Sequence, residues 1–124
     1  MAAVESTMLA LGTSAPAFSL PDAVSGKTIT LDTFARSKGL LVMFLCPHCP
    51  YVKHVQAGLA KLLKEYDGSA LGIVAISSND PAQYPEDGPD GLRAQAAQLG
   101  FAFPYCYDES QTAATAYRDR KSVV

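Results

Sequence analysis

The stretch LLVMFLCPHCP, residues Leu40–Pro50, decides the fold class. Its first six residues are all apolar, which predicts a central strand, Leu40–Leu45, that is buried on both faces. A second apolar run, Leu71–Ile76, predicts another buried strand. Between the two runs, Tyr51–Tyr66 repeats apolar side chains at spacings of three and four residues, as an amphipathic helix does. This order of strand, helix and strand predicts a βαβ unit with parallel strands.

Turn and cap signals predict the remaining elements of an α/β fold. The expected elements are a hairpin of Ala17–Leu20 and Thr28–Leu31, a short helix from an Asp32 cap to Ser37, a helix over Asp90–Leu99 ended by Gly100, a strand over Pro104–Tyr107, and a last helix through Tyr117 capped by Asp108 or Ser110. The βαβ unit therefore sits in the middle of a chain with an N-terminal hairpin.

Length, charge and the N-terminus limit the class of protein. A chain of 124 residues fits one domain. The net charge of -2, without a basic block, argues against nucleic acid or an anionic membrane as the main partner. No apolar run is long enough for a membrane span, and the N-terminus carries Glu5 without a basic region of a secretory signal. We therefore expect a cytoplasmic protein, in which thiols are mostly reduced.

The chain has three cysteines, Cys46, Cys49 and Cys106, an odd number that does not suit a secreted disulfide framework. A spacing of three residues in a helical turn places two Cα atoms about 5–6 Å apart, within the range of a disulfide. Cys46 and Cys49 are therefore the predicted catalytic pair. Cys106 and His54 are interpreted as a small core residue and a surface residue.

Cys46 is the expected nucleophile and Cys49 the expected resolving thiol. If the helix begins at the pair, its positive end stabilises the Cys46 thiolate and lowers the pKa of that thiol. Pro47 fits the first helical turn, and a protonated His48 adds positive charge. Pro50 is expected to kink the helix and keep Cys49 less exposed than Cys46.

Other interpretations of these residues stay open. Two buried structural cysteines, or an inactive descendant of a redox protein, would carry the same pair. A zinc site would need four ligands, for which only His48, His54 and Cys106 could join the pair, so we predict no metal. The acidic residues Glu86, Asp87 and Asp90 are interpreted as a solvated, proline-rich loop.

Several segments resemble the thioredoxin-like redoxin superfamily, which holds alkyl hydroperoxide reductase and the thiol-specific antioxidant. Gly12–Asp22 resembles the opening of redoxin domains, and Val42–His54 resembles the active-site stretch of a peroxiredoxin-like branch. Shorter similar segments are Ser78–Asp80, Tyr84–Asp87 and Phe103–Tyr105. The resemblance runs from about Leu11 to Tyr117. It implies a thioredoxin-like fold and thiol-based redox or antioxidant activity, for which we expect no cofactor.

The chain departs from this resemblance in two places. Typical peroxiredoxins carry Pro-x-x-x-Thr/Ser-x-x-Cys, whereas Val42 and Cys46 occupy the Pro and Thr/Ser positions before Cys49. The chain also stops before the cis-proline loop, the two antiparallel strands and the final helix of a thioredoxin fold. We therefore expect residues 1–118 to be a redoxin domain that is incomplete at its C-terminus, and residues 119–124 to be a non-native tail.

Three functions follow from these residues. The first is a thiol–disulfide oxidoreductase that uses the Cys-Pro-His-Cys pair. The second is a peroxiredoxin-like thiol peroxidase, and the third is a non-catalytic binding domain of the thioredoxin fold. The expected partners are protein or small-molecule thiols and disulfides, peroxides in the second case, and a thioredoxin-type reductant.

Overall fold

The computed structural model describes residues 9–47, 49–66, 70–78 and 85–118. The expectations for His48 and for the tail of residues 119–124 concern residues outside this part of the chain. The described elements are β1 (Ser19–Pro21), β2 (Thr28–Thr30), the 3₁₀ helix η1 (Leu31–Phe34), β3 (Gly39–Phe44), α1 (Pro50–Glu65), β4 (Leu71–Ser77), the 3₁₀ helix η2 (Pro85–Asp87), α2 (Pro89–Leu99), β5 (Tyr105–Tyr107) and α3 (Thr112–Ala116). The fold is α/β and thioredoxin-like, as the sequence predicts.

The predicted βαβ unit is confirmed. β3 pairs with β4 in parallel, with Val42 opposite Val74, and β4 pairs with β5 in parallel, with Ile76 opposite Cys106. The predicted hairpin is also confirmed, because β1 and β2 pair antiparallel. Since the three strands of the larger sheet are parallel, their carboxyl ends lie at one edge of the sheet.

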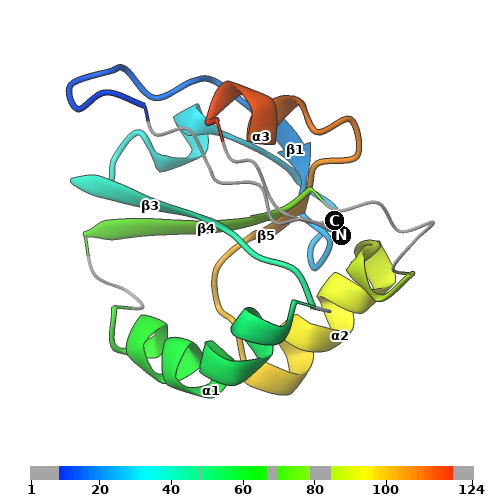
Figure 1. Ribbon diagram of the computed structural model, residues 1–124. Coiled ribbons are helices and arrows are strands. Elements are labelled where there is room, and N and C mark those ends of the chain that lie inside the picture. Colours follow the sequence, from blue (N-terminus) through cyan, green and yellow to red (C-terminus); the bar gives the residue numbers. More distant parts are fainter. Residues whose placement is uncertain (1–8, 48, 67–69, 79–84, 119–124) are drawn as a thin grey trace.

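Figure 1 shows the sheet between two layers. α1 and α2 lie on one side, and α3 lies on the other with the N-terminal hairpin. β4 and β5 contribute buried side chains to both faces of the sheet, because neighbouring residues of a strand point to opposite faces. Val74, Ile76 and Cys106 belong to the cluster under the hairpin, whereas Ala75 and Tyr105 belong to the cluster under α2.

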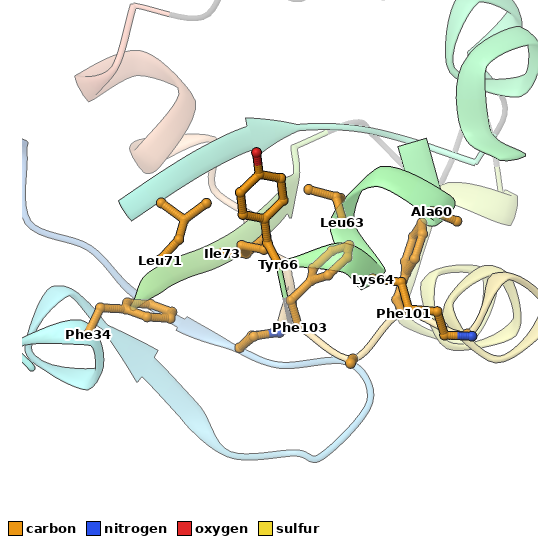
Figure 2. Close-up of a pocket in the computed structure, with 12 residues that line it drawn as sticks. Phe34, Ala60, Leu63, Lys64, Tyr66, Leu71, Ile73, Phe101 and Phe103 are labelled. Atoms are coloured by element: carbon orange, nitrogen blue, oxygen red, sulfur yellow. The ribbon is translucent and has the colours of Figure 1, made fainter. Parts of the chain in front are cut away.

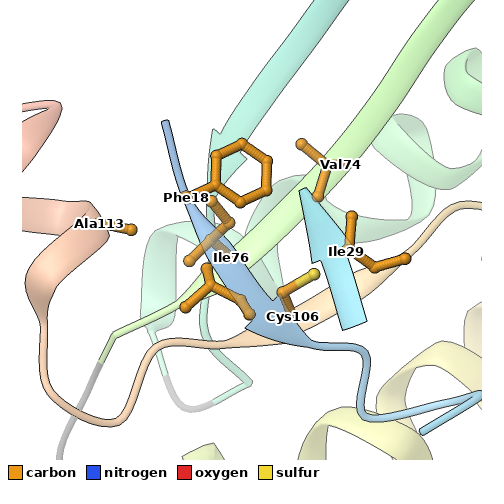
Figure 3. Close-up of a cluster of buried hydrophobic side chains, with 7 residues drawn as sticks. Phe18, Ile29, Val74, Ile76, Cys106 and Ala113 are labelled. Carbon is orange, nitrogen blue, oxygen red and sulfur yellow. The ribbon is translucent and has the colours of Figure 1, made fainter. Parts of the chain in front are cut away.

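The cluster under the hairpin is the larger part of the core and joins segments that are far apart in the sequence (Figure 3). Phe18 and Ile29 from the hairpin region meet Val74 and Ile76 from β4 and Ala113 from α3. Each of these side chains is less than a tenth exposed. The N-terminal hairpin therefore covers one face of the sheet with the apolar side chain at the centre of each of its strands.

The structure corrects the expected position of β3. It is an edge strand of the described sheet, and its side chains are half-buried or exposed, whereas β4 is the central strand and is buried almost throughout. An apolar run alone cannot tell a central strand from an edge strand, because strand order depends on contacts between distant segments.

The bounds of two helices also differ from expectation. The short helix is the 3₁₀ turn η1, and its N-cap is Thr30, not Asp32. The last helix begins after Gln111, although Asp108 still serves it, since Asp108 Oδ2 accepts a hydrogen bond from the Ala114 N–H. The predicted end of α2 is confirmed, because Gly100 is its C-cap at φ 69°, a left-handed conformation that favours glycine.

Candidate functional site

Cys46 and Cys49 lie on the connection between β3 and α1. Cys46 follows two residues after the end of β3, and Cys49 is the N-cap of α1. The helix begins at Pro50, whose missing N–H is harmless at the first helical position. The expected kink at Pro50 and the expected helical turn at Pro47 are therefore wrong. The positive end of the helix dipole lies at Cys49 and not at Cys46.

The exposure of the two cysteines is the reverse of the expected order. Cys46 is 1% exposed, whereas Cys49 is half-buried. The backbone explains this difference, because the Leu45 N–H still donates to the Ile76 carbonyl over 3.0 Å, so the chain follows the sheet up to Cys46. It leaves the sheet only afterwards, and a reagent from solvent therefore meets Cys49 first.

Tyr105, for which the sequence gives no functional signal, lies within electrostatic reach of Cys46 and is held by a buried hydrogen-bond network. The Tyr105 side chain is fully buried, and its hydroxyl donates to Gln95 Oε1 over 2.7 Å. Gln95 Nε2 in turn donates to Gln56 Oε1 on α1 over 3.3 Å. Burial raises the pKa of Tyr105, and the negative charges of Cys46 and Asp87 raise it further. The Tyr105 hydroxyl is therefore protonated and lies within electrostatic reach of both groups.

The acidic segment before α2 is not the solvated loop that the sequence suggests. Asp87 ends the 3₁₀ helix η2 and is fully buried, while its carbonyl accepts a hydrogen bond from the Ser77 hydroxyl. Asp90, in the first turn of α2, is exposed as expected and forms an ion pair with Arg93 over 2.9 Å. A sequence pattern gives no signal for this burial, because Asp87 is covered by residues from other parts of the chain.

Asp108 adds a second buried carboxyl group at the same edge of the sheet. It follows β5, and its Oδ2 accepts hydrogen bonds from the Ser78 hydroxyl, over 2.8 Å, and from the Ala114 N–H. Its Oδ1 has no hydrogen-bond partner among the described residues. The carboxyl ends of β3, β4 and β5 thus carry cysteines, a serine and a carboxylate.

Cys106 and His54 lie where the sequence analysis places them. His54 is exposed on α1. Cys106 is fully buried in the cluster under the hairpin. Burial, and after it the nearby Asp22, raises the pKa of Cys106 to about 12. This thiol is therefore neutral at physiological pH and is not available as a nucleophile.

A groove runs between α1 and α2 and begins near the turn that carries the cysteine pair. It has a volume of about 320 Å³, and we call it the α1–α2 groove. The described residues that line it are Pro47, Lys53, Gln56, Gly91, Ala94, Gln95 and Gln98. Because Pro47 lies next to Cys46 in the chain, the groove reaches the turn that carries the cysteines.

A second hollow of about 170 Å³ lies at the opposite edge of the sheet. Figure 2 shows its aromatic side chains, Phe34, Tyr66, Phe101 and Phe103. Leu71, the first residue of β4, also lines it, whereas the cysteine pair follows the carboxyl end of β3. This hollow is therefore not part of the cysteine site.

The described residues show neither a metal site nor a membrane span. No group of three or more His, Cys, Asp or Glu side chains in that part of the chain gathers in a way that could hold a metal ion. Among the same residues, no helix has the length and apolar character needed to cross a membrane.

Comparisons with known proteins agree with the fold. The sequence profile of the AhpC/TSA family matches residues 11–122. Among proteins with curated descriptions, none matches the chain. An uncharacterized conserved protein from Geobacillus kaustophilus is 46% identical, with a TM-score of 0.87 over 94% of this chain. A hypothetical protein from Sinorhizobium meliloti 1021 is 42% identical, with a TM-score of 0.86 over 91% of this chain.

The chain spans 62% and 61% of the length of these two proteins. A more distant structure is the peroxidoxin BcpB from Mycobacterium tuberculosis, which is 20% identical, with a TM-score of 0.68 over 86% of this chain and 64% of that one. At that identity the likeness concerns the fold alone.

Proposed function

Because the chain belongs to the AhpC/TSA family, we propose that it is a thiol–disulfide oxidoreductase that works through Cys46 and Cys49. The observation that carries the proposal is the position of the pair between the end of β3 and the N-cap of α1. At this position one thiol is accessible and the other is buried beside protonated Tyr105. Pro47, His48 and Pro50 are the supporting residues.

The exchange moves two electrons and two protons from the pair to a substrate disulfide. The attacking thiolate forms a bond to one substrate sulfur, the substrate S–S bond breaks, and the second substrate sulfur leaves and takes a proton. The other cysteine then attacks the mixed disulfide, closes the Cys46–Cys49 bond and releases the first substrate sulfur as a thiol. We place this activity in the cytoplasm, where a thioredoxin-type dithiol would reduce the pair again.

The order of attack in this proposal differs from the order expected from the sequence. Cys49 is the accessible thiol, and Cys46 is 1% exposed. A bulky substrate disulfide therefore meets Cys49 first, and Cys46 acts as the resolving thiol. The buried position suits that second role, because a mixed disulfide at Cys49 brings its sulfur to Cys46 without further diffusion.

Trapping of the mixed disulfide tests both the pair and its order. The pre-reduced chain is mixed with a small disulfide, 2-hydroxyethyl disulfide, and the protein mass is measured after quenching with acid. Cys46→Ser is expected to accumulate the adduct on Cys49, Cys49→Ser to form little adduct, and Cys106→Ala to cycle like the unchanged chain. An adduct that accumulates only in Cys49→Ser would restore Cys46 as the nucleophile. Undiminished disulfide formation in either single variant of the pair would refute the mechanism.

The family match also favours a second candidate, a peroxiredoxin-like thiol peroxidase. In that reaction a thiolate breaks the O–O bond of a peroxide, releases water or an alcohol, and becomes a sulfenic acid that the second cysteine condenses to a disulfide. Val42 and Cys46 replace the Pro and Thr/Ser of typical peroxiredoxins, and this favours the first candidate. Stopped-flow consumption of hydrogen peroxide separates the two, since a rate no faster than that of the amino acid cysteine removes the peroxidase.

A further inference from the structure

The α1–α2 groove presents side-chain amides from both of its walls. Lys53 and Gln56 are three residues apart on α1, and Gln95 and Gln98 are three residues apart on α2, so each pair shares one face of its helix. All four side chains line the groove. A glutamine amide offers both donors and an acceptor, which matches the alternating N–H and C=O groups of a peptide backbone.

Hydrogen bonds that reach from the core fix the orientation of two of these amides, Gln56 and Gln95. Gln95 Oε1 accepts from the buried Tyr105 hydroxyl over 2.7 Å, so its Nε2 faces Gln56. Gln56 Oε1 accepts from Gln95 Nε2, and this directs the two N–H donors of Gln56 away from that contact. The amide of Gln56 is therefore held on one side and presents donors on the other.

The described lining of the groove carries charge of one sign. Of the described residues that line it, Lys53 alone carries a formal charge, and its side chain is exposed. The groove also begins at Pro47, next to Cys46. A chain that lies in it would thus bring a disulfide to the cysteine pair while its flanking residues meet the amides and the ammonium group.

We propose that the α1–α2 groove holds the polypeptide of a protein substrate in an extended conformation, and that Lys53 selects substrates with an acidic side chain beside the disulfide. The inference rests on the proposed thiol–disulfide exchange and names its substrate class. An extended peptide fits because its backbone supplies hydrogen bonds to the amides regardless of sequence, while one charged contact adds specificity.

Three chromogenic probes test this proposal in single turnovers of the pre-reduced chain. Each is a mixed disulfide with 5-thio-2-nitrobenzoate, whose release is followed by absorbance. The first carries a six-residue peptide with glutamates beside its cysteine, the second the same peptide with lysines, and the third only 2-mercaptoethanol. We expect the glutamate peptide to react about fivefold faster than the lysine peptide at low salt, the gain that one exposed ion pair allows. The preference should fall as the salt concentration rises.

A charge reversal on each of two lysines of α1 supplies a matched pair of variants. Lys53→Glu is expected to remove or reverse the preference between the two peptides, after each peptide rate is divided by the rate of the same variant with the 2-mercaptoethanol probe. Lys61→Glu changes the net charge equally, but Lys61 does not line the groove, so its preference should stay that of the unchanged chain. Equal effects of the two reversals would overturn the groove proposal.

The outcomes also separate the groove from the proposed function. Absence of reaction with the 2-mercaptoethanol probe would refute the exchange mechanism, whatever the peptides do. In that case, peptides with serine in place of cysteine and a fluorescent label test the groove by anisotropy. Binding of the glutamate peptide that Lys53→Glu weakens and Lys61→Glu does not would support the groove. Equal binding of the glutamate and lysine peptides would overturn it.

Discussion

Two regions of this molecule carry cysteines in opposite surroundings. On the connection from β3 to α1, Cys49 is half-buried, and Cys46 is buried within electrostatic reach of Tyr105 on β5. On β5, Cys106 is enclosed by apolar side chains of the hairpin and β4. The difference predicts unequal reactivity for thiols of one residue type, because a thiol at a helix start is accessible and a thiol inside the core is not.

Thiol alkylation is expected to show the largest difference between the two regions. In the native, reduced chain, iodoacetamide should modify Cys49 first, whereas Cys106 should react more than about 1,000-fold more slowly, because its exposure requires opening of the core. Mass spectrometry of quenched, digested samples measures the two rates. Comparable rates at Cys49 and Cys106 would contradict the comparison, and a denatured sample is the control in which all three cysteines react.

A substitution in the core should lower the free energy of unfolding without changing the rate of disulfide formation by the folded chain. Ile76→Ala removes a fully buried side chain beside Cys106 and should lower the free energy of unfolding by about 2–5 kcal/mol. Urea unfolding followed by circular dichroism measures this loss. The rate of disulfide formation in the fraction that stays folded should change little. Leu62→Ala, on the exposed face of α1, is the matched control and should cost much less.

Tyr105 precedes the core residue Cys106 in the chain, but its hydroxyl interacts electrostatically with Cys46. Tyr105→Phe removes the donor to Gln95 Oε1 and leaves that buried acceptor unsatisfied, which should cost about 1–3 kcal/mol. It should also alter the pH profile of disulfide formation, because the hydroxyl lies within reach of Cys46. Tyr117→Phe removes a hydroxyl that donates to the Pro16 carbonyl and should leave that profile unchanged. If both variants and the unchanged chain had identical pH profiles, Tyr105 would have no influence on the reaction of the cysteine pair.

The smallest expected effect is a pH dependence of stability that comes from Cys106. The pKa of Cys106 is raised from 9.0 to about 12 in the folded chain, so the unfolded chain releases the proton at lower pH. The resulting stability is fully present below pH 9 and is lost as the pH rises toward 12. The stability difference between the unchanged chain and Cys106→Ala should therefore shrink between pH 8 and pH 10.5. A difference that is constant over this range would contradict the raised pKa.

Local patterns in the chain were sufficient to predict its elements. The apolar runs before Cys46 and at β4, and the helical stripe between them, predicted the βαβ unit because each pattern reports the repeat of its own element. They could not predict that β3 is an edge strand of the described sheet, since an edge and a centre differ only in what lies beside them. The burial of Asp87 could not be predicted either, because it depends on residues that are distant in the sequence.

The sequence by itself determined the α/β class, the parallel pairing and the candidate pair Cys46 and Cys49, because these depend on spacings along the chain. Only the tertiary structure decided which thiol of the pair is accessible. That order depends on a backbone hydrogen bond from Leu45 to Ile76 and on a helix that begins at Pro50. The α1–α2 groove is likewise formed by glutamines that lie 39 residues apart in the chain, Gln56 and Gln95. Such contacts arise from packing, for which local sequence carries no signal.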